Sequence, residues 1–442
     1  MPAAVAASPS DFRAPQRPTH APRLATSLER LRGAVLWLMA FSGAFVFMEP
    51  SPYEITSILA IIVFVITGLS LRAAIMPLVI ILTVYNIGFS IAVIPVLGEP
   101  KTLMWVLISW FMSATAIFFA AVLGKNTESR LALIVKGYMA AGVVASLAGI
   151  IGYFHIIPKL SDLFLRYERA RGTFNDPNVL GAFLIFPALI ALQRVLSGRT
   201  RDIFRSGIVL MILVVALLLS FSRAAWGQFA VTAVLMVAML FVTSRSRRER
   251  TRLVALSLAG AGALVLLIAA LLSIGSVSTL FEERASLEQS YDSGHTGRFG
   301  RHILGFLLAL DRPIGIGPLQ FAHFFPEDPH NAYLNSFMSG GWISGICYFT
   351  LVLTTIVIGY RTIFIATPWR KTYLAFYAAF LGVAGESTII DSDHWRHYFL
   401  ILGVLWGLIC ASQPYARRQR ATEGQHAAPP AAAPLAPSVR AS

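Results

Sequence analysis

The chain has 442 residues, of which 56% are hydrophobic and only 13% are charged. A soluble protein of this length needs a more highly charged surface, so the composition excludes that class and predicts an α-helical membrane protein. The net charge is +14, but no basic segment is interleaved with aromatic side chains as a nucleic-acid groove requires. We therefore expect no nucleic-acid partner.

Residues 1–32 are rich in Ala, Pro and Arg, and residues 414–442 are rich in Arg and then in Ala and Pro. The N-terminal segment lacks a short apolar core followed by a small-residue cleavage site, so we do not interpret it as a cleaved signal peptide. We predict that both segments are disordered cytoplasmic tails that flank one membrane domain at residues 33–413.

Apolar runs of roughly 20 residues, the length that crosses a bilayer, recur throughout this domain. They predict an all-α, polytopic membrane protein with about twelve transmembrane helices. The predicted spans are 33–49, 54–71, 74–96, 102–123, 131–154, 177–193, 207–222, 224–243, 253–276, 332–360, 372–390 and 397–413.

Arginine clusters follow the sixth, eighth, tenth and twelfth predicted spans. Because positive charge concentrates on the cytoplasmic side, these clusters predict that both termini are cytoplasmic. Two longer loops, at residues 155–176 and 277–331, then lie outside, and we predict that the second is partly helical. We expect the functional residues in these two loops.

The first outside loop carries arginines, against the usual charge bias. Its sequence LRYERARGTFNDPNVLG ends in Asp176 and Pro177, an N-cap followed by a proline at the first helical position. A helix N-terminus beside arginines can bind an anion such as phosphate. We therefore select Arg171 and Asn178 as candidate phosphate-binding residues, and contact with lipid headgroups or Glu168 is the alternative for Arg171. For Arg166 and Arg169 we expect contact with lipid headgroups or Glu168.

Arg223, within SFSRAAWGQF, interrupts an apolar stretch at 207–242 that is too long for one span and must form a hairpin. The first half, 207–222, would be roughly 24 Å long as a helix, which is shorter than a hydrocarbon core of ~30 Å. We therefore place Arg223 at or below the outer interface. An arginine there usually faces a cavity and a partner, although snorkelling to the headgroups is the alternative.

The second outside loop contains apolar residues at helical spacing next to Arg298. These residues are Phe299, Ile303, Phe306, Leu307 and Leu310. We predict an amphipathic helix on the outer membrane face, ended by the turn RPIGIGP. Arg298 could reach a lipid-linked phosphate, and a plain interfacial anchor is the alternative.

The same loop closes with FFPEDPHNAYLNSFMSGGW, in which His330 and Asn331 precede a predicted span. An ordinary histidine pKa near ~6.5 suits a general base that takes a proton from a sugar hydroxyl. We select His330 as this base and Asn331 as a substrate-binding residue. A capping or surface role is the alternative for His330.

Two acidic features lie near the last predicted span. The segment DSDHWRH, with Asp391 and Asp393, resembles a metal-binding DxD motif. We expect no metal there, because the segment lies outside, where nucleotide sugars are absent. Glu386, inside the preceding span, is an intramembrane acid that we expect to pair with an arginine.

Four segments, in this order, resemble the O-antigen ligase and O-antigen or exopolysaccharide polymerase superfamily. They are RGTFNDPNVLG, SFSRAAW, the loop arginine before RPIGIGP, and PHNAYL before a glycine-rich span. The resemblance covers residues 130–410. It implies a GT-C-like membrane glycosyltransferase fold, the inner membrane of a Gram-negative bacterium, and no metal or other cofactor.

The resemblance also implies the reaction, in which an undecaprenyl-diphosphate-linked oligosaccharide is transferred to a sugar hydroxyl on the periplasmic side. Carried onto this chain, it assigns Arg171 and Arg223 to the diphosphate, with Arg298 assisting, and His330 to the base. The acceptor is the lipid A–core in a ligase and another lipid-linked repeat in a polymerase. The lack of a lipopolysaccharide-specific feature favours a polymerase, for which a chain-length regulator protein is a possible partner.

Two other functions are weighed against this one. A transporter or flippase usually has paired halves and polar residues near the membrane midplane. Here the polar residues concentrate at the outer ends of the predicted spans and no half-repeat occurs. A scaffold for polysaccharide assembly is the other alternative.

Overall fold

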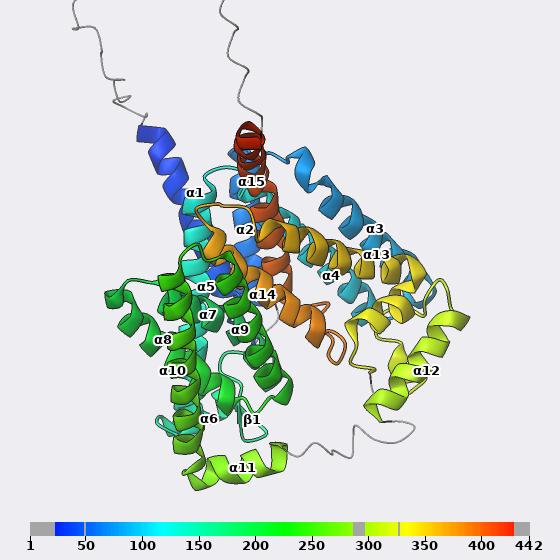
Figure 1. The fold of residues 1–442 in the computed structure, drawn as a ribbon. Coiled ribbons are helices and arrows are strands. Elements are labelled where there is room, and N and C mark those ends of the chain that lie inside the picture. The colour runs from blue at the N-terminus through cyan, green and yellow to red at the C-terminus, as the bar shows by residue number, and fades with distance from the viewer. Residues whose placement is uncertain (1–22, 48–49, 286–296, 326–327, 428–442) are drawn as a thin grey trace, which may run out of the picture.

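The computed structural model describes residues 23–47, 50–285, 297–325 and 328–427 (Figure 1). Nearly all of the secondary structure in these ranges is helical, and the strands form one short antiparallel hairpin, β1 (Leu165–Arg166) and β2 (Arg169–Ala170). The predicted all-α class is therefore confirmed.

A helix lies at each predicted span. These helices are α1 (Arg23–Ser42), α2 (Pro52–Ile66), α3 (Met76–Ala92), α4 (Pro100–Val122), α5 (Thr127–Tyr153), α7 (Pro177–Ser197), α8 (Thr200–Leu219), α9 (Arg223–Thr243), α10 (Arg247–Leu272), α13 (Ala332–Thr362), α14 (Arg370–Glu386) and α15 (Arg396–Ala427). Nine helices of the described ranges are long and apolar enough to cross a bilayer, and α2 is a shorter apolar helix. The chain is therefore a multi-pass membrane protein.

The first and last helices extend beyond the spans predicted for them. Helix α1 begins at Arg23, and α15 continues to Ala427. Residues 1–22 and 428–442 lie outside the described part of the chain, so the disorder expected of the tails stays a prediction.

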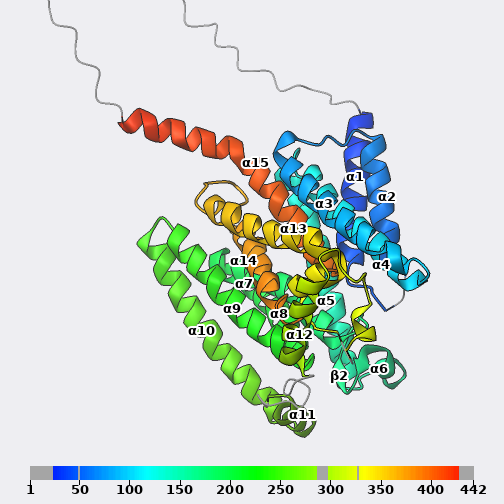
Figure 2. The same ribbon diagram turned by 90° about the vertical axis from the view of Figure 1, so that its right-hand side faces the viewer.

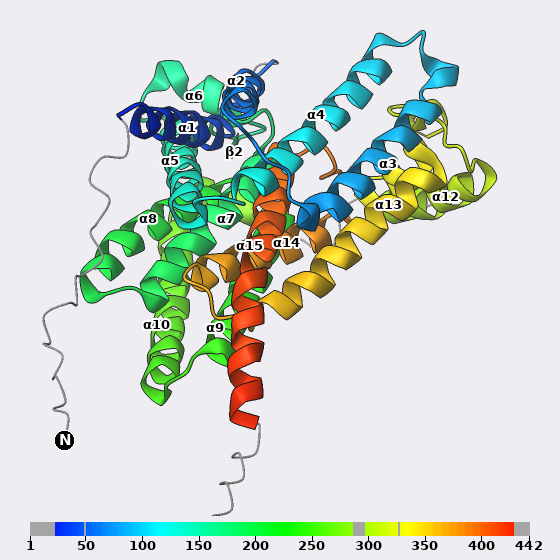
Figure 3. The ribbon, with the colours of Figure 1, turned by 90° about the horizontal axis from the view of Figure 1, so that it is seen from above.

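The bundle has a densely packed centre and two looser sides. In Figure 3, α3, α4, α12 and α13 extend to one side, and α8 and α10 lie on the other. Helix α3 packs along α13, α4 along α15, α1 along α5, and α9 along α14. In α7 and α15, 78% of the apolar window is buried, against 6% in α10. Helix α10 accordingly lies at the edge of the bundle in Figure 2.

Helix α13 is broken near its middle, and the RPIGIGP turn fills the break. Gly341 has φ 72° and ψ −177°, a backbone conformation that is essentially restricted to glycine. The Ile316 N–H donates to the Met338 carbonyl at 2.8 Å, and the Trp342 N–H donates to the Pro313 carbonyl at 2.9 Å. The turn therefore satisfies backbone groups that the break removes from the helix.

We expect Gly341→Ala to lower the thermal stability of the protein. A Cβ at this position would lie 2.5 Å from the Ile314 carbonyl and 2.7 Å from the Pro313 oxygen. The backbone strain alone is about 1–3 kcal/mol, and the collision adds to it. The midpoint of thermal unfolding in detergent measures the effect. Gly227→Ala is the matched control, because its Cβ would meet no atom within 4 Å; equal midpoints for the two variants would contradict the prediction.

The two predicted outside loops contain short elements. The first holds α6 (Pro158–Phe164) and the β1–β2 hairpin, and the second holds α11 (Gly275–Ala285) and α12 (Arg298–Asp311). Short 3-10 turns, η1 (Ala73–Ile75), η2 (Ile94–Val96) and η3 (Phe321–His323), complete the fold.

Helix α12 is the predicted amphipathic helix, and its existence is confirmed. The apolar residues of its outer face are all exposed: Phe299, Ile303, Phe306, Leu307 and Leu310. The opposite face packs on α13, where a Cβ on Gly305 would lie 2.6 Å from the Met338 sulfur. The contact of the exposed face with a membrane stays a prediction.

Candidate active site

The candidate site lies where α7, α9 and α13 begin, which we call the site end of the bundle. Helix α7 begins as predicted, with Pro177 at its first position and the Asp176 carboxylate accepting from the Asn178 N–H at 2.7 Å. Helices α7 and α9 are in close contact, because a Cβ on Gly181 would lie 2.6 Å from the Ala225 Cβ. The two helix starts therefore share one corner of the site end.

Arg169 occupies this corner. Its side chain is buried, with Nε donating to the Ser220 carbonyl at 2.8 Å and Nη2 donating to the Asn178 Oδ1 at 2.7 Å. The expected contacts of Arg169 with lipid headgroups or Glu168 stay a prediction, and the contacts with Ser220 and Asn178 were not expected. The guanidinium links the hairpin loop to the start of α7 and to the end of α8.

Arg171 contacts a different element. Its Nε donates to the Leu163 carbonyl at 3.1 Å, and its Nη2 lies 3.5 Å from the Asp162 carbonyl, so this side chain holds the last turn of α6. Arg171 is part-exposed, and its phosphate-binding role stays a prediction. Arg298 is the first residue of α12, and its side chain lies outside the described part of the structure.

Arg223 lies at the same corner as Arg169. It is the first residue of α9, directly after Ser222, whose hydroxyl caps the helix by accepting from the Ala225 N–H at 3.4 Å. The hairpin predicted from the short first span is confirmed, and Phe221 makes its turn with φ 46°. Arg223 is half-buried and follows by three residues the Ser220 carbonyl that Arg169 contacts.

His330 lies just before α13 and is held by Asp391. The His330 Nδ1 is 3.0 Å from the Asp391 Oδ2, and the Asn331 N–H donates to the other oxygen of the same carboxylate at 3.1 Å. The Asn331 side chain caps α13 by accepting from the Leu334 N–H at 3.0 Å. This contact gives Asn331 a structural role, and its substrate contact stays a prediction.

The second aspartate of DSDHWRH makes a similar contact one turn into α13. Asp393 is buried, and its Oδ2 accepts from the Asn335 side chain at 2.9 Å. The Asn335 Oδ1 in turn accepts from the Ser339 hydroxyl at 2.6 Å. Both aspartates therefore fix the start of α13, on which the position of His330 depends. The sequence had suggested only the DxD spacing and not these partners.

Helix α14 connects the histidine to the arginine corner. The Ala332 N–H donates to the Ser387 carbonyl at 2.9 Å, directly after the end of α14. Helix α14 packs along α9, and a Cβ on Gly382 would lie 2.3 Å from Thr232, two to three turns from Arg223. His330 and Arg223 therefore lie at the same end of the bundle, on helices that both contact α14.

Gln228 in α9 and Glu386 at the end of α14 are both buried. Both carboxylate oxygens of Glu386 and both amide atoms of Gln228 lack a hydrogen-bond partner among the described residues. The expected pairing of Glu386 with an arginine is therefore wrong for this part of the chain.

The electrostatic surroundings of His330 include a third carboxylate. Partial burial of Asp328 and the negative charge of Asp391 raise the pKa of Asp328, while His330 and Arg301 act in the opposite direction. His330 and Arg301 therefore lie close enough to Asp328 to oppose the rise of its pKa.

A comparison with protein families matches residues 208–349 to the family described as O-antigen ligase. The resemblance to the O-antigen ligase and polymerase superfamily is confirmed. The matched segment includes Arg223, Arg298, His330 and Asn331, whereas Asp391 lies outside it. This match indicates an activity of the ligase or polymerase type on lipid-linked glycans in a membrane. No curated protein matches the chain.

Proposed function

We propose that this protein is a glycosyltransferase of the bacterial inner membrane that transfers an undecaprenyl-diphosphate-linked oligosaccharide to a sugar hydroxyl on the periplasmic side. The observation that carries the proposal is the hydrogen bond between His330 and Asp391 at the end of the bundle that also holds Arg223. A base and a cationic anion-binding corner are the two groups that such a transfer needs.

His330 is the proposed general base. When Nδ1 donates to Asp391, the Nε2 carries the lone pair and takes the proton of the acceptor hydroxyl. The hydroxyl oxygen attacks the anomeric carbon, and the bond from that carbon to the diphosphate oxygen breaks. The electron pair leaves on the diphosphate, while Asp391 stabilises the imidazolium that forms.

Arg223 and Arg169 are proposed to stabilise the leaving diphosphate. A guanidinium presents a fork of donors that matches phosphate oxygens, and its charge opposes the charge that grows as the bond breaks. Each close contact in a partly buried site is on the order of 4 kcal/mol at an effective dielectric of 20. Because the arginines supply this charge, we propose that the reaction needs no metal. Arg171, Arg298 and Asn178 are further proposed donor-binding residues.

The acceptor is proposed to be the end of a second lipid-linked repeat, as in a polymerase, and the lipid A–core is the competing acceptor of a ligase. A polymerase of this kind is a candidate partner for a chain-length regulator protein. The arginine clusters at the end of the bundle away from the site support the proposed orientation, with both termini in the cytoplasm.

Purified protein in liposomes tests the proposal. With an undecaprenyl-diphosphate-linked repeat as donor, we expect longer glycans or glycosylated lipid A–core, together with free undecaprenyl diphosphate, without an ion gradient and with EDTA present. The extended product identifies the acceptor. Movement of the lipid-linked repeat between leaflets without any new glycosidic bond would overturn the proposal and favour a flippase.

A further inference from the structure

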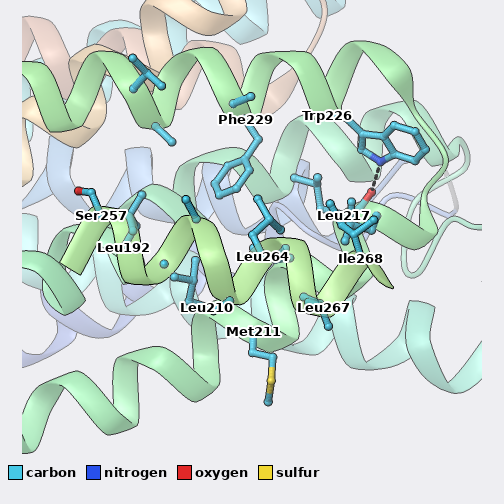
Figure 4. A pocket seen from close by; sticks show the side chains of 18 of the residues that line it. Leu192, Leu210, Met211, Leu217, Trp226, Phe229, Ser257, Leu264, Leu267 and Ile268 are labelled. Carbon is cyan, nitrogen blue, oxygen red and sulfur yellow. Dashed lines mark hydrogen bonds between the residues drawn. The ribbon is translucent and has the colours of Figure 1, made fainter. Parts of the chain in front are cut away.

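A long apolar cavity lies between α8, α9 and α10 (Figure 4). Its volume is about 1120 Å³. Its lining side chains are almost all aliphatic or aromatic, and none of them is charged. Ser257 carries the only hydroxyl among them, and the Trp226 indole N–H is already donated to the Leu217 carbonyl at 3.1 Å. The cavity therefore accepts a hydrocarbon and excludes a sugar or a phosphate.

The cavity extends over most of the length of these helices. Leu192, Gly207 and Phe241 line it near the end of the bundle opposite the site, and Phe221 and Trp226 line it near the site end. A chain inside it would thus lie along the membrane normal, with one of its ends at the site.

The site end of the cavity coincides with the arginine corner. Phe221, in its lining, follows Ser220, whose carbonyl accepts from Arg169. Trp226, also in its lining, is one helical turn after Arg223. The apolar cavity thus ends next to a pair of arginines. This combination matches a molecule with a long hydrocarbon chain and an anionic head.

Helix α10 forms the outer wall and packs loosely. Only 6% of its apolar window is buried, and Leu253 is the one buried side chain along its described length. A wall with so few contacts can separate from α9 at little cost in free energy, so a chain can enter sideways from the bilayer.

We propose that this cavity holds the polyprenyl chain of the donor, with the diphosphate at Arg223 and Arg169. The inference rests on the proposed function and assigns the place of the lipid part of the substrate. Two arginines bind a diphosphate more favourably than they bind the headgroup of a common zwitterionic phospholipid. The single phosphate of that headgroup is already balanced by the cation of the same headgroup.

Two glycines on α10 provide a matched pair of variants. Gly260 lines the cavity and Gly262 does not, and a Cβ on either would meet no atom within 4 Å. Gly260→Trp therefore fills part of the cavity, whereas Gly262→Trp places the same side chain on the same helix outside the cavity. Midpoints of thermal unfolding equal to that of the wild-type protein, for both variants, establish that the fold is intact.

The first measurement uses undecaprenyl diphosphate with a photoreactive group on its terminal isoprene and no sugar. In wild-type protein in nanodiscs we expect crosslinks to α8, α9 or α10 residues of the cavity, lost in Gly260→Trp and kept in Gly262→Trp. Crosslinks elsewhere, or equal labelling by a photoreactive phospholipid that undecaprenyl diphosphate does not displace, would overturn the inference. Because this probe carries no glycan, the result does not depend on the transfer reaction.

The second measurement compares donors of different chain length. Excluding two or more CH₂ groups from an apolar site lowers affinity ~10-fold. Gly260→Trp should therefore raise the KM for the undecaprenyl donor at least that much and leave the KM for a donor with a short prenyl chain unchanged. Equal effects on both donors would overturn the inference. If neither the wild-type protein nor any variant transfers glycan, but the wild-type protein is still crosslinked in the cavity, the proposed function fails and the lipid site stands.

Discussion

Replacing His330 with alanine is expected to lower the rate of glycan transfer by ~10²–10⁴-fold, the usual contribution of a positioned general base. The imidazole is the group proposed to take the proton of the acceptor hydroxyl, and its Nδ1 lies 3.0 Å from the Asp391 Oδ2. The initial rate with purified protein, donor and acceptor measures the effect, and donor binding should change little because His330 does not contact the diphosphate in the proposed reaction.

The Asp391→Asn variant tests the orientation of the His330 imidazole, because it changes the partner of the imidazole and leaves the proposed base in place. An asparagine can present its NH₂ to Nδ1 and favour the wrong tautomer, so the rate should fall, and the double variant His330→Ala/Asp391→Asn should be no slower than His330→Ala alone. His323→Ala is the matched control, since His323 is an exposed histidine of the same loop. Full activity of His330→Ala, or additive effects in the double variant, would contradict the assignment of the base.

The membrane fold could be predicted from the sequence because its main determinant is local. A span is recognised by its own apolar residues, and all the predicted spans contain helices. The start of α7 and the helix α12 were also predictable, from the Asp176–Pro177 pair and from apolar residues at helical spacing. Each of these signals lies within a few consecutive residues.

The features that were missed depend on contacts between distant segments. The break at Gly341 exists because the turn at Pro313 occupies it, and a glycine-rich span alone does not distinguish a broken helix from a continuous one. Asp391 is 61 residues from His330, so their contact leaves no signal in the local sequence. The spacing of Asp391 and Asp393 resembled only a metal-binding motif. Arg169 and Arg171 are two residues apart and carry the same charge, so the sequence does not distinguish their roles. The structure does, because the two side chains have different hydrogen-bond partners.

Arg223→Ala is expected to lower kcat by ~10²–10³-fold, as removal of one preorganised group that stabilises transition-state charge does. Arg223 begins α9 beside the corner that Arg169 occupies, and partial burial there strengthens the proposed interaction with a phosphate. Arg223→Lys keeps the charge and loses the fork of donors, so it should recover only part of the rate. Rates at saturating donor, compared with donor binding, measure how much of the effect belongs to the transition state.

Arg312→Ala is the control for loss of one positive charge near the site end, because Arg312 is exposed and pairs only with the neighbouring Asp311 in the described structure. It should retain nearly full activity. Arg169→Lys and Arg171→Ala then distinguish the two arginines of the first loop, and we expect the larger loss from Arg169, whose guanidinium lies at the start of α7 and the end of α8. If Arg171→Ala were the more severe, or if Arg223→Ala matched Arg312→Ala, the diphosphate would have to bind away from this corner.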